Sequence, residues 1–171
     1  MGRDTPGLLR AALGTAVFVL LVPGTVVVIG PWLVTNWRFA PPLLGLRATR
    51  WLGAALLVLA LPLFAAFNLR FVLEGRGTPT PIAPTERLVV GGPFRWVRNP
   101  GYLSVIALVV GQALLFASPW LFLYAAAMAF GFHLFVLLYE EPTLRRRFGA
   151  EYEAYCGAVP RWIPRLEQPK W

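Results

Sequence analysis

The chain has little of what most enzyme sites use. Its 171 residues include one cysteine, one histidine, one lysine and only eight acidic residues. The lone Cys156 rules out an intrachain disulfide and gives no reason to expect a thiol metal site. A P-loop, a nucleophile-elbow motif, a zinc-type His and Cys cluster and the glycine fingerprint of dinucleotide-binding domains are also missing. The sequence therefore does not indicate the common forms of nucleophilic, phosphoryl-transfer or metal-assisted catalysis.

Charge is sparse, whereas apolar residues dominate. Charged residues make up 14% of the chain and hydrophobic residues 57%, with a mean hydropathy of +0.61, which indicates an integral membrane protein. The net charge of +8 could suit nucleic acid, but the basic residues lie beside apolar runs and no nucleic-acid-binding motif is present. We therefore expect the lipid bilayer, with its anionic headgroups, as the partner rather than nucleic acid.

Uncharged runs predict an all-α membrane fold with about four transmembrane helices. The longest run, Asn99–Tyr139, has 41 residues and would be about 60 Å long as one helix, roughly twice the apolar thickness of a bilayer. It must fold back, and Ser118-Pro119 is the natural corner. The prediction for this single membrane domain, 1–171, is spans at about 8–30, 50–73, 100–117 and 119–140, and an amphipathic surface helix at about 142–157. We expect Pro23-Gly24 to kink the first span.

Four spans would place both termini and the proline-containing loop 74–98 on one side of the membrane. That side holds 13 of the 16 Lys and Arg residues, so the positive-inside rule predicts that it is cytoplasmic. We expect a multi-pass protein of a bacterial-type inner or plasma membrane, with cytoplasmic N- and C-termini. The loop 74–98 is long for a simple connection and its prolines stiffen it, so we interpret it as functional.

The segment before the third predicted span has the features of a helix start at the membrane surface. Arg95, Trp96 and Arg98 are residue types that settle at headgroup level. Asn99 is expected to cap the helix with its side chain, and Pro100 suits the first helical position. The N-terminus of this helix would then be a seat for a carboxylate or phosphate group.

Glu140 and Glu141 are unusual because they stand at the expected end of a membrane helix. Two explanations are open: an ion pair with Arg145 or another arginine, or a bound cationic ligand. His133 lies two helical turns before Glu140, so both would share one face about 10 Å apart. An ionisable group inside a span suggests function, although a hydrogen bond between helices would explain His133 equally well. Gln112 in the third span is open to the same two explanations, of which a hydrogen bond between helices is the more common.

Several short motifs follow one another in the second half of the chain. They are Gly77-Thr78-Pro79, Leu88-Val89, Gly92-Pro93-Phe94-Arg95, Arg98-Asn99-Pro100-x-Tyr102, Glu140-Glu141, Arg147-Phe148-Gly149, Tyr152-x-x-Tyr155 and Val159-Pro160. As an ordered set over about residues 75–165, they resemble the integral-membrane methyltransferases of the isoprenylcysteine carboxyl methyltransferase and phospholipid methyltransferase superfamily. The missing acid–base machinery agrees with this resemblance, because methyl transfer from a sulfonium mainly requires that donor and acceptor be aligned.

The resemblance implies that S-adenosylmethionine binds at the cytoplasmic ends of the last spans, under the C-terminal helix. Glu140 would hold a polar or cationic part of this cofactor, and the N–H groups after Asn99 would receive its carboxylate. Positions that match the family imply cofactor binding by Glu86, Arg87, Leu88, Val89, Phe94, Asn99, Pro100, Gly101, Tyr102 and Glu140. Arg98, Glu141 and His133 are further candidates, no metal ligand is expected, and no catalytic residue is assigned.

The methyl acceptor stays open at this point. Val136 stands where enzymes that act on prenylated cysteine have an arginine, so we expect a lipophilic or small apolar acceptor that enters between helices. Two other functions are compatible with the sequence. One is an NADPH-dependent reductase of the membrane sterol-reductase type, whose cofactor phosphates could bind Arg87, Arg95 and Arg98. The other is a non-catalytic membrane module on the same scaffold.

Overall fold

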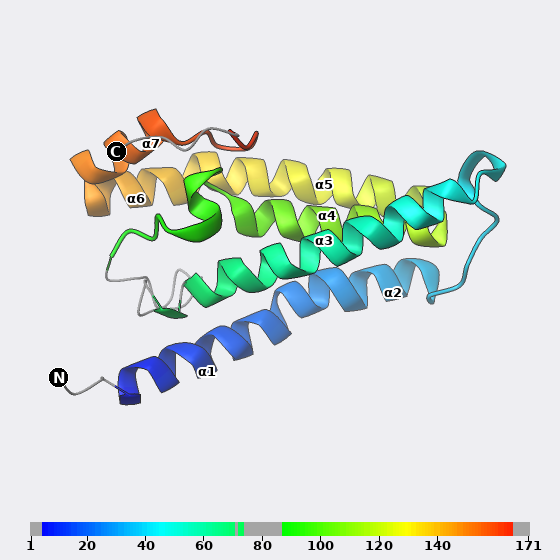
Figure 1. The fold of residues 1–171 in the computed structure, drawn as a ribbon, viewed down its shortest axis with the longest axis horizontal. Helices are drawn as coiled ribbons and strands as arrows, with labels where there is room; N and C mark the ends of the chain where they lie inside the picture. Colours follow the sequence, from blue (N-terminus) through cyan, green and yellow to red (C-terminus); the bar gives the residue numbers. More distant parts are fainter. Residues whose placement is uncertain (1–4, 71, 74–86, 166–171) are drawn as a thin grey trace.

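The computed structural model describes residues 5–70, 72–73 and 87–165, with side chains from residue 12 onward. Helices make up the regular structure of this part of the chain, and it contains no strand (Figure 1). The helices are α1 (Thr5–Leu21), α2 (Gly30–Thr35), α3 (Ala48–Arg70), α4 (Pro100–Phe116), α5 (Pro119–Phe135), α6 (Glu141–Phe148) and α7 (Ala150–Ala158). Short π-helical turns, η1 (Thr25–Ile29) and η5 (Val136–Glu140), and 3-10 turns, η2 (Leu43–Gly45) and η4 (Gly92–Arg95), complete the set.

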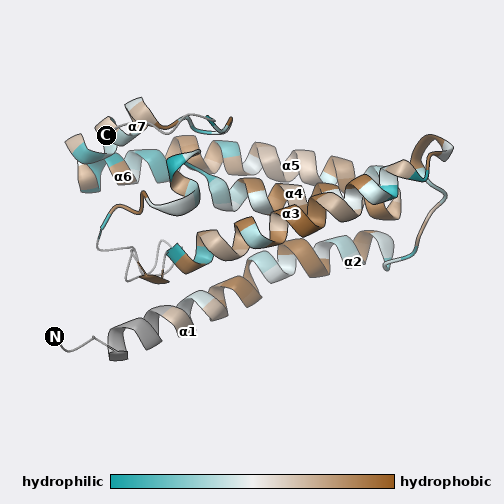
Figure 2. Cartoon of the chain, viewed as in Figure 1, coloured by the Kyte–Doolittle hydropathy of each residue, from teal (hydrophilic) through white to brown (hydrophobic). Residues whose placement is uncertain are grey.

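Three helical stretches are long and apolar enough to cross a membrane. They are Ala12–Thr35, Ala48–Arg70 and Pro119–Phe148. Helix α4 is also apolar but has only 17 residues, so the described part of the chain has three such stretches where the sequence predicts four spans. Figure 2 shows brown apolar residues along α3 and teal polar residues at α6. The regular structure of the described residues is therefore all-helical, with three candidate membrane-spanning helices.

Helices α3 and α4 pack closely because each has a glycine where they meet. A Cβ atom at Gly53 would lie 2.6 Å from the carbonyl oxygen of Gly111, and one at Gly111 would lie 2.9 Å from Leu57. Small residues permit this close approach of two backbones in a membrane, where packing replaces the hydrophobic effect as the driving force. The α3–α4 pair, with α5 against α4, carries the site described below (Figure 1).

The π-helical turn η1 interrupts the first helix next to Pro23-Gly24, where the sequence predicts a kink. Polar side chains from two other helices reach the backbone at this turn. The Gln112 side chain donates to the carbonyl oxygen of Val27 at 2.8 Å, and the Tyr124 hydroxyl donates to that of Val26 at 3.1 Å. The interpretation of Gln112 as a donor between helices is confirmed, and these bonds connect the first helix to α4 and α5.

The predicted corner between the last two apolar helices is also present. Ala117 has a left-handed backbone with φ of 56°, and α5 begins at Pro119. Ala113, Phe116 and Leu121 form a small buried apolar cluster around this corner. Two residues explain why the chain reverses here. Ala117 ends α4 in a left-handed conformation, and Pro119, whose φ is fixed near the helical value, starts α5.

The C-terminal third differs from the sequence prediction in two places. The helix of α5 does not end at Glu140 but continues through η5 into α6, because Pro142 stands in the first turn of α6, where its missing N–H is not needed. Where a single surface helix is predicted at about 142–157, the structure has two helices, because α6 ends at Phe148 and Gly149 separates it from α7. Gly149 has φ of 52°, a conformation that favours glycine.

We expect Gly53→Ala to weaken the α3–α4 contact by about 1–3 kcal/mol, because the added methyl group would overlap the backbone of Gly111. The measurement is the thermal unfolding midpoint of detergent-solubilised protein. Gly131→Ala on α5 is the matched control, because a Cβ atom there meets nothing within 4 Å. Equal midpoints for the two variants would contradict the close packing of α3 and α4.

Candidate functional site

The start of α4 is connected to the C-terminal segment of the chain. Helix α4 begins at Pro100, as the sequence predicts, but the predicted side-chain cap by Asn99 is wrong. The Asn99 amide instead donates to the carbonyl oxygen of Arg161 at 3.1 Å. The backbone N–H of Arg98 donates to the carbonyl oxygen of Pro160 at 2.9 Å. This bond turns the Asn99 side chain toward the C-terminal segment, and the side-chain oxygen accepts from none of the first-turn N–H groups of α4.

Tyr102 and Glu140, 38 residues apart in the sequence, meet between α4 and η5. The Tyr102 hydroxyl donates to Oε2 of Glu140 at 2.7 Å. Within the described ranges, no arginine or lysine lies within ion-pair distance of Glu140. Both side chains are half-buried. Glu140 is thus a partly desolvated carboxyl group whose partner is a neutral phenol rather than a cation.

Aromatic rings surround Tyr102 on two sides. Its ring centroid lies 4.7 Å from that of Phe132 and 6.4 Å from that of Trp162. The indole N–H of Trp162 donates to Nδ1 of His133 at 3.1 Å, which places the proton of the neutral imidazole on Nε2. The hydrogen-bond partner of His133 therefore comes from the C-terminal segment and not from a neighbouring helix. Through Trp162, His133 belongs to the same cluster as Tyr102 and Glu140.

Glu141 has the opposite environment to Glu140. It is 3% exposed, and the Arg161 guanidinium donates to both of its oxygens, at 2.6 and 2.9 Å. Nη1 of Arg98 lies 3.2 Å from Oε1, and Nη2 of Arg145 lies 4.0 Å from Oε2. The hydrogen bond to Glu141 raises the pKa of the Arg161 guanidinium, so this planar two-point pair stays charged. The ion-pair explanation considered for the acidic pair therefore holds for Glu141 and not for Glu140.

Other implied site residues pack beneath α7. Leu88, Val89 and Phe94 belong to an apolar cluster, together with Tyr152, Tyr155 and Val159. The Tyr155 hydroxyl donates to the carbonyl oxygen of Phe94 at 2.8 Å, and burial raises the pKa of this hydroxyl, which keeps it a donor. The ring of Phe67 lies 5.7 Å from that of Phe94 and covers Gly101, where a Cβ atom would come within 2.5 Å of it.

The remaining implied residues have different surroundings. Arg87 is exposed, and Glu86 lies outside the described residues. Nη1 of Arg98, besides its ion pair, donates to Sγ of Cys156 at 2.6 Å. The described part of the chain contains no group of His, Cys, Asp and Glu side chains suited to hold a metal ion.

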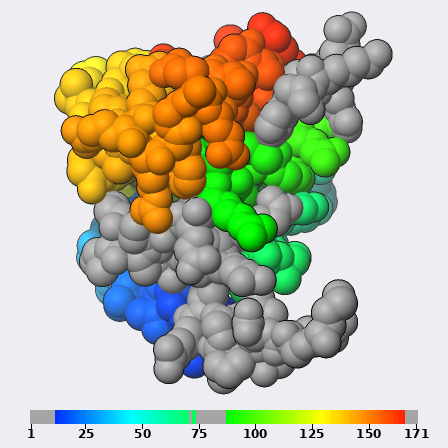
Figure 3. Space-filling view, turned by 90° about the vertical axis from the view of Figure 1, so that its left-hand side faces the viewer, coloured from blue at the N-terminus to red at the C-terminus, as the bar shows by residue number. Residues whose placement is uncertain are grey.

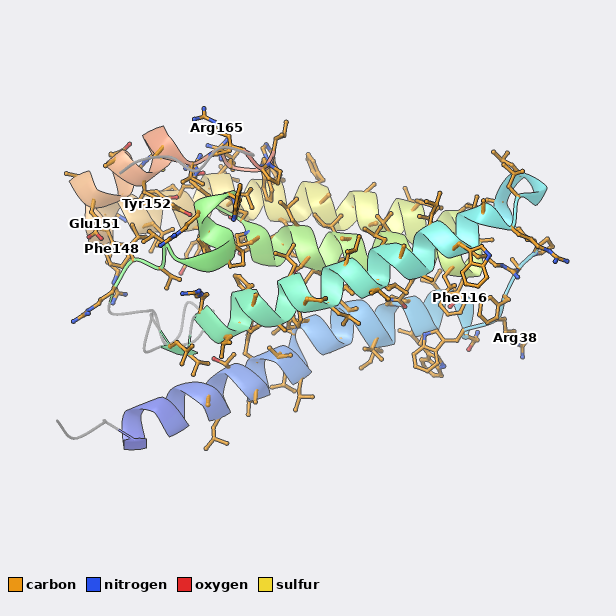
Figure 4. The ribbon with its side chains drawn as sticks, viewed as in Figure 1. Arg38, Phe116, Phe148, Glu151, Tyr152 and Arg165 are labelled. Carbon is orange, nitrogen blue, oxygen red and sulfur yellow. The ribbon has the colours of Figure 1, made fainter. Side chains whose placement is uncertain are left out.

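The cluster lies at one end of the molecule. Figure 3 looks onto this end, where the orange residues of α6 adjoin the green residues that precede α4. Figure 4 places Phe148, Glu151 and Tyr152 at this end, with Phe116 and Arg38 at the opposite one. The described motifs, from Leu88-Val89 to Val159-Pro160, therefore converge at this end, although they lie far apart in the sequence.

The sequence model of the phospholipid methyltransferase family matches residues 48–151, more than half of the chain. The chain belongs to this family. The matched range contains the start of α4, Tyr102 and both acidic residues, Glu140 and Glu141.

Curated relatives match a shorter part. A rice protein described as a probable protein-S-isoprenylcysteine O-methyltransferase is 31% identical over 82 residues, covering 48% of this chain and 43% of the rice protein, in the indica and japonica subspecies alike. Protein-S-isoprenylcysteine O-methyltransferase B of Arabidopsis thaliana is 28% identical over 79 residues, covering 46% of this chain and 40% of that protein. The matched segment thus spans less than half of each relative. No solved structure matches the chain.

Sequence reasoning missed three members of the cluster. Arg161 and Trp162 follow the Val159-Pro160 motif and lie beyond the range matched by the family model. A cation and an indole directly after a motif were a usable signal, because both residue types anchor segments at a membrane surface. Phe132 was one apolar residue among many on α5, and nothing in its neighbours distinguished it.

We expect the two adjacent carboxylates to respond differently to the same substitution. Glu141→Gln leaves buried arginine charge without its partner and should lower stability by on the order of 2 kcal/mol. Glu140→Gln keeps an acceptor for Tyr102 and breaks no ion pair, so its unfolding midpoint should stay close to that of the unaltered protein. Thermal unfolding in detergent measures both, and a larger loss for Glu140→Gln would contradict the assignment of the ion pairs to Glu141.

Proposed function

We propose that the protein is an S-adenosylmethionine-dependent methyltransferase that acts on a lipophilic or small apolar acceptor at the cytoplasmic face of the membrane. The observation that carries this proposal is the half-buried Glu140 carboxyl group, which has Tyr102 as its hydrogen-bond partner and no cation beside it among the described residues. A carboxylate in that position is suited to a cationic ligand. Membership of the phospholipid methyltransferase family supports methyl transfer as the chemistry.

The charges of the residues present match those of such a cofactor. S-adenosylmethionine has an ammonium and a sulfonium group, and when bound it supplies the activated methyl group. Glu140 would hold one of these cationic groups, and the N–H groups at the start of α4, beside the buried Pro100 and Gly101, would donate to the cofactor carboxylate. Tyr102 orients Glu140 through its hydrogen bond. Arg87, Leu88, Val89, Phe94 and Asn99, with Glu86, are proposed as further contacts on the resemblance alone.

The proposed topology keeps four spans. Helix α4 would be about 26 Å long, close to the apolar thickness of a bilayer, and it packs between α3 and α5. With α4 as the third span, both termini lie in the cytoplasm, and the C-terminal helix α7 lies at that surface. This arrangement puts Glu140 and Tyr102 at the level where a cofactor from water meets an acceptor from the bilayer.

The acceptor is proposed to differ from a prenylcysteine carboxylate. Val136, at the position where prenylcysteine enzymes have arginine, is 1% exposed and packs in the interior. It offers no charge to grip a carboxylate. Large apolar side chains of the same helix, Phe130, Leu134 and Leu138, are exposed toward the surroundings, as expected beside lipid. A neutral lipophilic acceptor that arrives through the bilayer suits this composition.

Arg98 favours the methyltransferase over the reductase alternative. Its guanidinium already lies against the Glu141 carboxylate and the Cys156 sulfur. A phosphate of a nicotinamide cofactor would have to displace these contacts. For this reason NADPH serves as the comparison ligand below rather than as a second proposal.

We expect S-adenosylhomocysteine to bind the purified, detergent-solubilised protein with micromolar affinity in a calorimetric titration, and NADPH not to bind. Glu140→Gln should weaken the binding about tenfold or more, because a charge-assisted contact is lost. Tyr102→Phe removes only the hydroxyl that orients Glu140 and should weaken binding less. Tyr139→Phe, an exposed neighbour with the same chemical change, is the control.

Two outcomes of that titration would contradict the proposal. Binding of NADPH alone would support the reductase. Folded protein that binds neither ligand would support the non-catalytic module, and in that case Glu140→Ala should also leave the cellular phenotype intact.

We expect methyl-labelled S-adenosylmethionine to transfer label to the lipid-extractable fraction of bacterial membranes that contain the protein. Membranes that contain the Glu140→Gln variant should show no such transfer. Because Val136 replaces the arginine of prenylcysteine enzymes, the label should resist mild alkali, which releases methanol from carboxyl methyl esters. Alkali-labile label on an added N-acetyl-S-farnesylcysteine would show instead that a carboxylate is the acceptor.

A further inference from the structure

The segment 159–165 follows α7 without regular structure, yet polar contacts hold it at four points besides the hydrogen bond of Trp162 to His133. The donor and acceptor pairs are Arg161 to Glu141, Asn99 to the Arg161 carbonyl, the Arg98 N–H to Pro160, and the Arg165 N–H to Trp96. The strongest of these is the ion pair of Arg161 and Glu141, which we call the clasp. It joins the segment to the first turn of α6.

Only the first residue of the segment, Val159, is buried, and the residues after it are half-buried or exposed. Ile163 is 80% exposed, and Pro164 and Arg165 are exposed as well. Helix α7 is already anchored by its own buried tyrosines, Tyr152 and Tyr155. The polar contacts of the segment are therefore explained better by the residue that they position than by the stability that they add.

What it positions is Trp162. This residue directly follows the clasp arginine, and its indole lies against Tyr102 and donates to His133. Tyr102 in turn donates to Glu140. A chain of contacts thus leads from the buried Glu141, through Arg161, Trp162 and Tyr102, to Glu140, the carboxyl group beside it in the sequence. Binding groups of a site need such neighbours to keep their side chains in one orientation.

We infer that Trp162 is a positioning residue of the candidate cofactor site, and that Arg161 and Glu141 act on the site through Trp162. The inference rests on the proposed function. It assigns Glu141 to the clasp and leaves Glu140 alone to meet the ligand. Because Arg161 and Trp162 lie beyond residues 48–151, this support comes from outside the part of the chain that the family model matches.

The first measurement needs no ligand. The protein is labelled with 5-fluorotryptophan, and its fluorine NMR signal for Trp162 is assigned by its loss in Trp162→Phe. Arg161→Gln should shift or broaden this signal, while Glu141 keeps Arg98 and Arg145 as partners and the protein stays folded. Arg146→Gln is the matched control, because Arg146 is exposed and its guanidinium has, within the described ranges, only the Thr143 hydroxyl as a hydrogen-bond partner. An unchanged Trp162 signal in Arg161→Gln would overturn the inference.

The second measurement is titration with S-adenosylhomocysteine. Arg161→Gln and Trp162→Leu should each raise its Kd by about tenfold or less, the scale of one aromatic contact. The double variant should bind no more weakly than Trp162→Leu, because Arg161 has nothing left to act through. Trp162→Phe keeps a ring against Tyr102 and should recover most of the affinity. Trp120→Leu, an exposed tryptophan at the other end of α5, should change nothing.

The outcomes separate this inference from the proposed function. If the unaltered protein binds and Glu140→Gln does not, but Trp162→Leu binds normally, the positioning role is wrong and the proposed function stands. Losses that add up in the double variant would also overturn the inference, since the two residues would then act independently. If the unaltered protein does not bind at all, the proposed function fails, and the inference falls with it whatever the Trp162 signal shows.

Discussion

The buried carboxylate of Glu141 governs the end of the molecule that holds the candidate site. Removing a carboxylate from water costs several kcal/mol unless cations and hydrogen bonds replace the solvent. Here the cations come from three separate parts of the chain: Arg98 before α4, Arg145 on α6 and Arg161 in the C-terminal segment. Because the single carboxylate of Glu141 pairs with all three arginines, it fixes the relative positions of the start of α4, helix α6 and the C-terminal segment.

The neighbouring Glu140 shows why this division matters for function. Two adjacent carboxyl groups leave a helix in different directions, so one can point into a cluster of arginines while the other meets Tyr102. The π-helical turn Val136–Glu140 ends between them, and such turns are often found at functional sites. One carboxylate has become part of the scaffold, and its neighbour keeps the capacity to meet a cation.

Local rules predicted well where local groups decide the structure. The helix start at Pro100, the corner at Ser118-Pro119 and the interruption near Pro23-Gly24 all follow from prolines and small residues within a few positions. The same rules were wrong for the Asn99 cap and for the helix end at Pro142. In the first case the Asn99 amide donates to a distant carbonyl group. In the second, the proline stands in the first turn of α6, where a helix tolerates it.

The sequence by itself determined the membrane class, the helical architecture and the motifs that belong to the phospholipid methyltransferase family, because composition and short-range spacing encode these properties. The family resemblance also implied that Glu140 and Tyr102 lie near each other, and a hydrogen bond joins them in the structure. Only the tertiary structure decided that Glu141 takes the arginines, and that Trp162 joins Tyr102 and His133. Contacts between residues twenty to sixty positions apart depend on how helices approach in space, and no local period in a sequence records that approach.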